Sequence, residues 1–502
     1  MESSAGQVRV EANGSSGSPQ GTAGAATRGA LRGRLVDLYE LIASRVHLCL
    51  PDVWIGERGW NATLLLELLA YVCRGSLLLL GPYGWGKTTS AQVVAAILGG
   101  MPLRGVRLAT IQGTPGLTEE RAIAPPNLGK LVRDGIVEPV WTAAARFHVM
   151  LIDELTRIPE ILQSGLLTGA DDGQFKAFGG IIEKRRGVLY STANYERHRG
   201  SFEPIDALID RHAWACEVGW PGPLLARRIS EHDTEAAYVE LGLRERGDEA
   251  EALLTGPYDP AGLEAFSDEF RSDLAARGVP TLSTAELDRV YAEIRGLPLS
   301  EAAEGYLMML LSAMSSCVRT RFKRLSAFVE DFQIAQDCPA DCRFHGMTCS
   351  KTLGGGSHRL DKAIRLGAAG IAWLAGASVV NEEHLRAVAP FALLHRATFS
   401  RALLDEVKAQ PRRYSVRLEA SRRLVEGFDK EYRKHRTEID TARQWMTEHP
   451  AETREGLLMI DGAALAIEEA PHPFIVDLAM SLYPELEDLY PRIAAGSTGR
   501  AT

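Results

Sequence analysis

Length and composition place the chain among globular proteins. Its 502 residues are 45% hydrophobic and 24% charged, which excludes a wholly disordered chain and allows about two to four domains. The net charge of -9 disfavours a non-specific nucleic-acid binder, because such proteins usually carry a basic surplus. No apolar run reaches about 18 residues and the N-terminus lacks a signal-peptide pattern, so we expect a soluble cytoplasmic protein without membrane contact.

The first part of the chain alternates between strand and helix patterns. Residues 1–30 are rich in Gly, Ser and Ala, and they predict a disordered tail because they offer almost no large apolar side chain to bury. Residues 31–220 predict an α/β fold with a parallel sheet flanked by helices, since short apolar runs recur between helical patterns. These runs are Ser76–Leu80, Val106–Ile111, Val149–Ile152 and Gly187–Ser191.

Helical patterns dominate after residue 220. They predict a helical region over residues 221–397 and a charged helical C-terminal extension over residues 398–502. In the extension, apolar residues follow one face of an amphipathic helix, which we expect to pack onto the rest of the protein. The predicted helices are Leu224–His232, Thr284–Arg295, Glu301–Ala313, His358–Ala375 and Glu382–Arg396, and the apolar face carries Leu418, Val425, Phe428 and Tyr432.

A phosphate-binding loop follows the strand predicted at Ser76–Leu80. The loop fits G-x-x-x-x-G-K-[ST] and opens a predicted helix, where backbone N–H groups and the helix N-terminus favour phosphate. We expect Lys87 to reach the β- and γ-phosphates of ATP and the Thr88 hydroxyl to bind Mg²⁺. The nucleotide-binding residues predicted are Gly81, Pro82, Tyr83, Gly84, Trp85, Gly86, Lys87, Thr88 and Thr89.

Polar residues at the ends of two later strands complete a candidate hydrolytic set. Asp153 follows an apolar strand, where a Mg²⁺ ligand is expected, and Glu154 next to it is suited to orient the attacking water. Asn194 ends another strand, either to bind water or phosphate or simply to form a turn. Arg211 ends a predicted short helix, either as an arginine finger for a neighbouring subunit or as a surface residue paired with Asp210.

Four cysteines gather in the second half of the chain. Cys317, Cys338, Cys342 and Cys349 have the spacing C-x20-C-x3-C-x6-C, with His345 between the last two. Four thiolates suit Zn²⁺ or an iron–sulfur cluster, but the spacing is not the usual pair of C-x2-C knuckles. A disulfide and separate thiols therefore remain open alternatives.

The order of these motifs resembles an AAA+ ATPase, and finer matches resemble the MoxR-like branch of that family. The resemblance implies a nucleotide-binding core at residues 31–220 and a helical lid at residues 221–397 that carries the cysteine-bearing insert, residues 315–352. It also implies that Arg359 is a second sensor, which reaches the nucleotide from the lid. The segments that carry the finer matches are Ile111–Pro115, Leu151–Pro159, Gly356–Arg359 and Leu366–Arg396.

The resemblance implies a function as well as a fold. MoxR-like proteins hydrolyse ATP to ADP and phosphate in hexameric rings, remodel or activate protein clients in a chaperone-like way, and often work beside a von Willebrand factor A domain protein. Residues 221–282 and 315–352 depart from the family pattern. Two alternatives are a nucleic-acid motor on the same core and a nucleotide-bound scaffold with little turnover; Glu154 and Arg211 argue against the scaffold.

Overall fold

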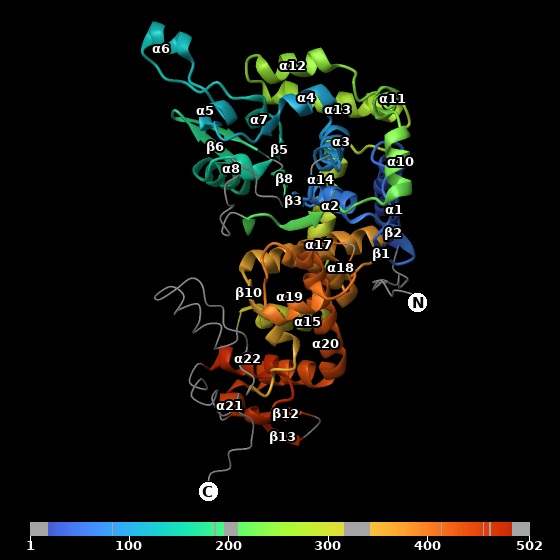
Figure 1. Cartoon of the computed structure of the whole chain (residues 1–502), viewed down its shortest axis with the longest axis vertical. Coiled ribbons are helices and arrows are strands. Elements are labelled where there is room, and N and C mark those ends of the chain that lie inside the picture. Colours follow the sequence, from blue (N-terminus) through green and yellow to red (C-terminus); the bar gives the residue numbers. More distant parts are fainter. Residues whose placement is uncertain are drawn as a thin grey trace. The chain divides into compact units, whose positions relative to one another are not determined.

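The chain divides into two compact units. One comprises Met1–Leu297 with Leu366–Ser378, and the other comprises Pro298–Arg365 with Val379–Thr502. Figure 1 shows their elements. The computed structural model describes residues 19–82, 84–184, 187–194, 209–315, 342–412, 414–454, 456–460 and 463–483. No helix among these residues is long and apolar enough to cross a membrane.

A five-stranded parallel sheet forms the centre of the first unit. Its strand order is β4-β5-β8-β3-β9, so the chain crosses over between neighbouring strands. The central strands are continuous apolar runs because helices cover both faces of a parallel sheet. The strands are β3 (Ser76–Leu80), β4 (Thr110–Gln112), β5 (Val149–Asp153), β8 (Val188–Ala193) and β9 (Trp214–Glu217). The predicted α/β architecture is therefore confirmed.

Helices near the sheet depart from the sequence expectations in two places. The helix α1 (Pro19–Arg45) begins inside the segment expected to be a disordered tail. The run expected as a strand at Val106–Ile111 is divided between helix α4 (Leu103–Leu108) and β4, because Leu103 and Val106 bury one face of a helical turn. The other helices of this core are α2 (Ala62–Val72), α3 (Lys87–Gly99), α5 (Glu119–Ala122), α6 (Leu128–Asp134), α7 (Ala143–Arg146) and α8 (Glu160–Asp172).

The helices that follow β9 pack back onto this core. Among them, α12 contacts α4 and α7, α13 contacts α3, and α14 contacts α1 and α2. In Figure 1, α12 lies beside α4. Side chains of Asp233, Asp259 and Ser283 accept hydrogen bonds from the first turns of α11, α13 and α14, which fixes where these helices begin. The bounds are α10 (Pro223–Glu231), α11 (Thr234–Glu240), α12 (Gly247–Thr255), α13 (Pro260–Ala276) and α14 (Thr284–Arg295).

Two small hairpins accompany the first unit. One pairs β1 (Val53–Ile55) with β2 (Arg58–Trp60), and the other pairs β6 (Gln174–Ala177) with β7 (Gly180–Glu183). The second hairpin follows α8 directly, and Lys184 at its end is buried. The residue that follows this hairpin therefore places an amino group in the interior of the unit.

The long helix α20 (Val416–Glu448) organises the second unit. It packs against α15, α18, α19 and α22, and the predicted apolar face at Leu418, Val425, Phe428 and Tyr432 is buried as expected. The expectation of an all-helical extension misses a hairpin of β12 (Leu457–Ile460) and β13 (Ala463–Ala466). The other elements are α15 (Glu301–Ser315), β10 (Thr352–Gly354), α18 (Glu382–Leu393), β11 (Thr398–Phe399), α19 (Arg401–Lys408), α21 (Pro450–Arg454) and α22 (Pro473–Leu482), and α17 (His358–Ala375) has residues in both units.

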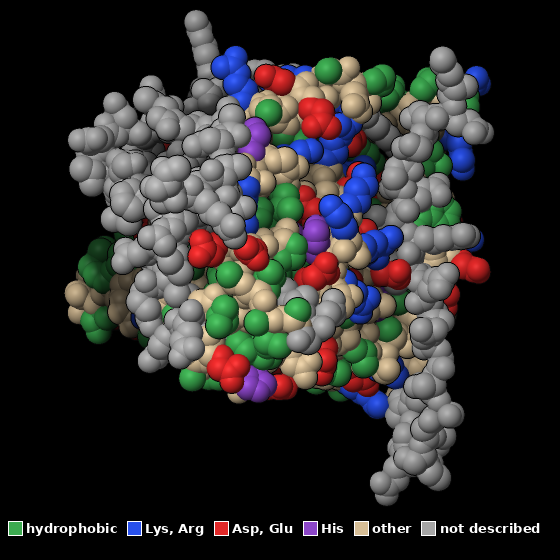
Figure 2. Space-filling view, turned by 90° about the horizontal axis from the view of Figure 1, so that it is seen from below, with side chains coloured by type: hydrophobic (Ala, Val, Ile, Leu, Met, Phe, Trp, Pro, Cys, Tyr) green, Lys and Arg blue, Asp and Glu red, His purple; other side chains and the backbone are tan. Residues whose placement is uncertain are grey.

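Charged side chains on the face shown in Figure 2 are mixed in sign, with Lys and Arg lying among Asp and Glu. Helix α20 forms ion pairs, since Arg423 pairs with Glu406 at 3.0 Å and Arg433 pairs with Asp429 at 3.1 Å. Exposed pairs of this kind contribute only about 0–1 kcal/mol each to stability. Positive and negative side chains are therefore interspersed on the described part of this face.

Candidate nucleotide-binding site

Glycines give the loop after β3 its shape. Gly84 and Gly86 have φ of 75° and 81°, a left-handed conformation that residues with a Cβ adopt only at a cost. The helix α3 then begins at Lys87, so its unpaired N–H groups face the loop. A Cβ on Gly86 would come within 3.0 Å of the His47 ring, so the loop also lacks room for a side chain there. Tyr83 lies outside the described residues.

Lys87 is held at this loop by three oxygen acceptors. Its Nζ donates to the carbonyl oxygens of Gly81 at 2.7 Å and Pro82 at 2.6 Å, and to Oδ1 of Asn194 at 2.9 Å. Burial lowers the pKa of Lys87, while Asp153 and Glu154 act in the opposite direction. The structure therefore brings Asn194, from the end of β8, to the ammonium group of the loop.

Asp153 connects the loop to two strands. Its Oδ1 accepts hydrogen bonds from the hydroxyls of Thr88 and Thr192, each at 2.6 Å. Carboxylate and hydroxyl oxygens are the hard ligands that Mg²⁺ prefers, so Thr88 and Asp153 fit the predicted metal. Thr192 was not among the predicted site residues, although it lies in β8 only two residues before Asn194.

Glu154 has an unusual backbone. Its φ of 55° and ψ of 53° are left-handed, and its N–H donates to the Thr192 hydroxyl at 3.0 Å. Its carboxylate forms an ion pair with Arg157 at 2.6 Å. A non-glycine residue in this region costs on the order of 1–3 kcal/mol, and such strain concentrates at functional sites. The turn therefore places the carboxylate beside Asp153 at the same edge of the sheet.

A buried acid beneath the loop was also missed. Glu67 of α2 is fully buried, and its Oε1 accepts a hydrogen bond of 2.6 Å from Ser90 of α3. Burial raises the pKa of Glu67 to about 8, and the hydrogen bond from Ser90 acts against that rise. The sequence does offer a signal for this buried acid, because Glu67 interrupts the otherwise apolar pattern of α2. This contact fixes α3, and so the loop, against α2.

Arg211 lies where the strands of the sheet begin, whereas the loop lies where they end. Its backbone oxygen accepts a hydrogen bond of 3.1 Å from Ser76, the first residue of β3, whereas the loop follows the last residue, Leu80. Four residue steps of about 3.3 Å separate those ends by about 13 Å, beyond the reach of one side chain. The guanidinium contacts the carboxylate of Asp171 at 3.4 Å.

The remaining predicted residues belong to the second unit or lie outside the described residues. Arg359 is exposed in the first turn of α17 and belongs to the second unit. Cys317 and Cys338 lie outside the described residues, and Cys349 donates weakly to the carbonyl of Phe344 at 3.8 Å. Within the described part of the chain, no three His, Cys, Asp or Glu side chains form a metal-binding group. The sensor role of Arg359 and the cysteine site remain predictions.

Two family descriptions match the chain. The AAA domain of the dynein-related subfamily matches residues 76–207, and an AAA lid domain matches residues 349–413. Over these two segments the chain is similar to AAA+ proteins, with a core domain followed by a lid domain. This AAA+ core holds the loop, Asp153 and Asn194 in the order that the motifs predicted.

Solved structures are similar in fold. A protein from Cytophaga hutchinsonii described as a "putative ATPase" is 17% identical, with a TM-score of 0.52, over 82% of this chain and 98% of that one. A full-length MCM homologue from Methanopyrus kandleri is 14% identical, with a TM-score of 0.35, over 75% of this chain and 61% of that one. No curated protein matches the chain.

Proposed function

We propose that this AAA+ chain binds ATP with Mg²⁺ and hydrolyses it to ADP and phosphate. The observation that carries the proposal is a pair of hydrogen bonds, one from Lys87 to Asn194 and one from Thr88 to Asp153. Thr88 and Asp153 would hold Mg²⁺, which neutralises phosphate charge when bound. The chain itself supplies a cradle of N–H groups and one ammonium for the β- and γ-phosphates.

The carboxylate of Glu154 is the proposed group that orients water. It lies next to Asp153 in the chain, and its strained backbone fixes its direction. In the structure Arg157 occupies this carboxylate, so we infer that Arg157 releases it when a nucleotide is bound. Asn194 would then hydrogen-bond to the γ-phosphate or to the water through its amide.

Assembly and client action rest on the family resemblance and on Arg211. Because Arg211 lies too far from its own loop, a finger role requires a neighbouring subunit, as in a ring. We propose a hexameric homo-oligomer that remodels or activates a protein client, with a von Willebrand factor A domain protein as the candidate partner. The net charge of -9 and the mixed charges in Figure 2 favour a protein client over the nucleic-acid motor.

Calorimetry on Lys87→Ala tests nucleotide binding. Loss of a charge-assisted contact worth ~1.5–3 kcal/mol should weaken ATP binding by at least about tenfold. Lys408→Ala, which removes an exposed lysine of α19, is the matched control and should bind ATP normally. Unchanged affinity in Lys87→Ala would overturn the proposal. For the client, affinity purification with a Glu154→Gln variant should retain the partner in an ATP-dependent way.

A further inference from the structure

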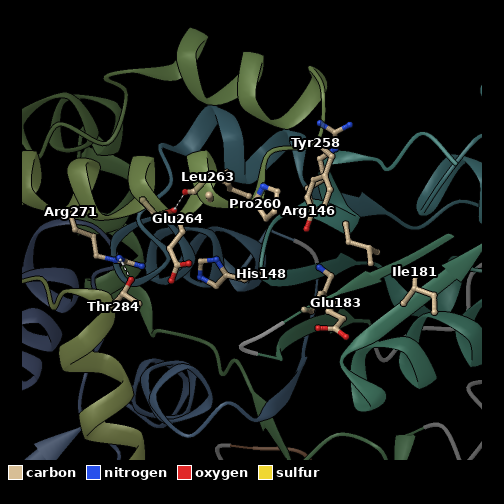
Figure 3. A pocket seen from close by; sticks show the side chains of 14 residues that line it. Arg146, His148, Ile181, Glu183, Tyr258, Pro260, Leu263, Glu264, Arg271 and Thr284 are labelled. Carbon is tan, nitrogen blue, oxygen red and sulfur yellow. Dashed lines mark hydrogen bonds between the residues drawn. The ribbon is translucent and has the colours of Figure 1, made fainter.

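A cavity apart from the nucleotide site lies between the AAA+ core and the helices inserted after β9. Its volume is about 330 Å³, and residues of α7, the end of β7, and α13 line it (Figure 3). His148, which also lines it, directly precedes β5, whereas Asp153 ends that strand at the nucleotide site. The cavity is therefore at the opposite edge of the sheet from the phosphate loop.

Two buried cations of this cavity have no carboxylate partner among the described residues. Arg146 is 8% exposed and donates to the carbonyls of Trp141 at 2.9 Å and Gly256 at 2.6 Å. Lys184 is 6% exposed, and its ammonium donates only to carbonyls, those of Ala144 and Phe147, at 2.6 Å each. In the described part of the chain, neither side chain forms an ion pair.

A third buried cation of the same cavity provides the contrast. Arg271 is 2% exposed, but Asp268 balances it at 2.6 Å. Burial without such a partner lowers the pKa of Arg146, and it lowers the pKa of Lys184 to about 7. Buried charge is normally paired, because desolvation of a lone ion costs several kcal/mol. The two unpaired cations thus leave a charge that a ligand of opposite sign would balance.

We propose that this cavity binds a small molecule through one oxyanion group, a phosphate or a carboxylate, recognised by Arg146 and Lys184. A cavity of about 330 Å³ is at the lower end of the range for small-ligand sites. Figure 3 shows the side chains of Glu264 and His148 directed toward one another in the same cavity. The carboxylates of Glu183 and Glu264 also line the cavity and would repel a second anionic group, so the structure favours a ligand with a single oxyanion.

Helix α13, which forms one side of this site, belongs to the stretch at residues 221–282 that departs from the family pattern. Pro260, Ala261 and Leu263 of α13 close the cavity over the core. His148 directly precedes β5 and Asp153 ends it, so the strand runs from this cavity to the nucleotide site. The ligand is nevertheless distinct from ATP, because the phosphate loop lies at the other edge.

Calorimetry with sulfate, inorganic phosphate and acetate tests the inference in full-length Lys87→Ala protein, in which the phosphate loop is disabled. We expect one binding site per chain for at least one of these anions. Arg146→Met should weaken it at least tenfold. Ala261→Trp should do the same by filling the mouth without touching a buried charge, and Ala275→Trp, on an exposed position of α13, should leave affinity unchanged.

The probes separate the two sources of the oxyanion. Tighter binding of sulfate and phosphate indicates a phosphate-bearing ligand, and tighter binding of acetate indicates a carboxylate. The inference would be overturned if none of the three anions bound. It would also be overturned if adding Arg146→Met or Ala261→Trp to the Lys87→Ala protein left its anion affinity unchanged. Because the phosphate loop is disabled throughout, this outcome is independent of whether the chain hydrolyses ATP.

Discussion

Glu154 combines a strained backbone with a carboxylate next to the Asp153 strand end. We predict that Glu154→Gln binds ATP with unchanged affinity but hydrolyses it at least about a hundredfold more slowly, because the amide cannot accept a proton from water. Phosphate release measures turnover, and calorimetry measures binding. The control is Glu160→Gln, a nearby exposed acid in the first turn of α8, which should retain turnover. Wild-type turnover in Glu154→Gln would assign the water-orienting role to another group.

Glu67 makes stability depend on pH. Its folded pKa of about 8 is above the ordinary value of 4.5, so the fold holds a proton that the unfolded chain releases. This contribution to stability is full below about pH 4.5 and is lost as pH rises toward 8. Glu67→Gln keeps a hydrogen-bonding group without a charge, and its melting temperature should exceed that of wild type more at pH 8.5 than at pH 5.

Thermal unfolding of wild type and Glu67→Gln between pH 5 and 8.5 measures this difference in melting temperature. Glu231→Gln, an exposed acid of α10 paired with Arg227, is the control and should follow the wild-type curve. A pH-independent difference between Glu67→Gln and wild type would show that Glu67 does not titrate between pH 5 and 8.5.

The end of helix α3 lies in close contact with helix α13. Gly100 ends α3 with φ of 65°, and a Cβ there would overlap the carbonyl oxygen of Ser267 in α13. Gly278, just beyond α13, has φ of 81° but open space around it. Gly100→Ala should therefore cost the left-handed strain of about 1–2 kcal/mol and an additional ~1–3 kcal/mol of overpacking. Gly278→Ala should cost the strain alone.

Denaturant unfolding of the two alanine variants tests this contact. The larger loss of stability in Gly100→Ala would show that the inserted helix α13 is held tightly against the core helix α3. Equal losses in the two variants would mean that α13 shifts easily, which would also weaken the cavity built on that helix.

The local sequence predicted the α/β pattern and the bounds of several helices. It did not predict segments whose residues suit both a strand and a helix. The helices predicted at Thr284–Arg295 and His358–Ala375 have those bounds in the structure. Val106–Ile111 was misassigned because its apolar run is too short to separate a strand from a buried helical turn. The hairpin of β12 and β13 was missed, since its residues also suit a helix.

At the scale of the whole molecule, the position of Arg211 predicts catalysis between subunits. Arg211→Ala alone and Lys87→Ala alone should each lose most ATPase activity. Mixing the two should recover part of it, because some interfaces then combine an intact loop with an intact Arg211. Turnover per chain should also rise with protein concentration as subunits assemble. Full activity of Arg211→Ala alone would exclude the finger role.

The sequence by itself determined the phosphate loop, the acids after β5 and the parallel α/β class. These features depend on residues that are close in the chain, so spacing and apolar runs suffice to identify them. Only the tertiary structure decided the strand order, the Thr192 contact with Asp153, the burial of Glu67 against Ser90 and the cavity around Arg146 and Lys184. Those contacts join residues far apart in sequence, and their energies depend on burial and distance, which no local pattern encodes.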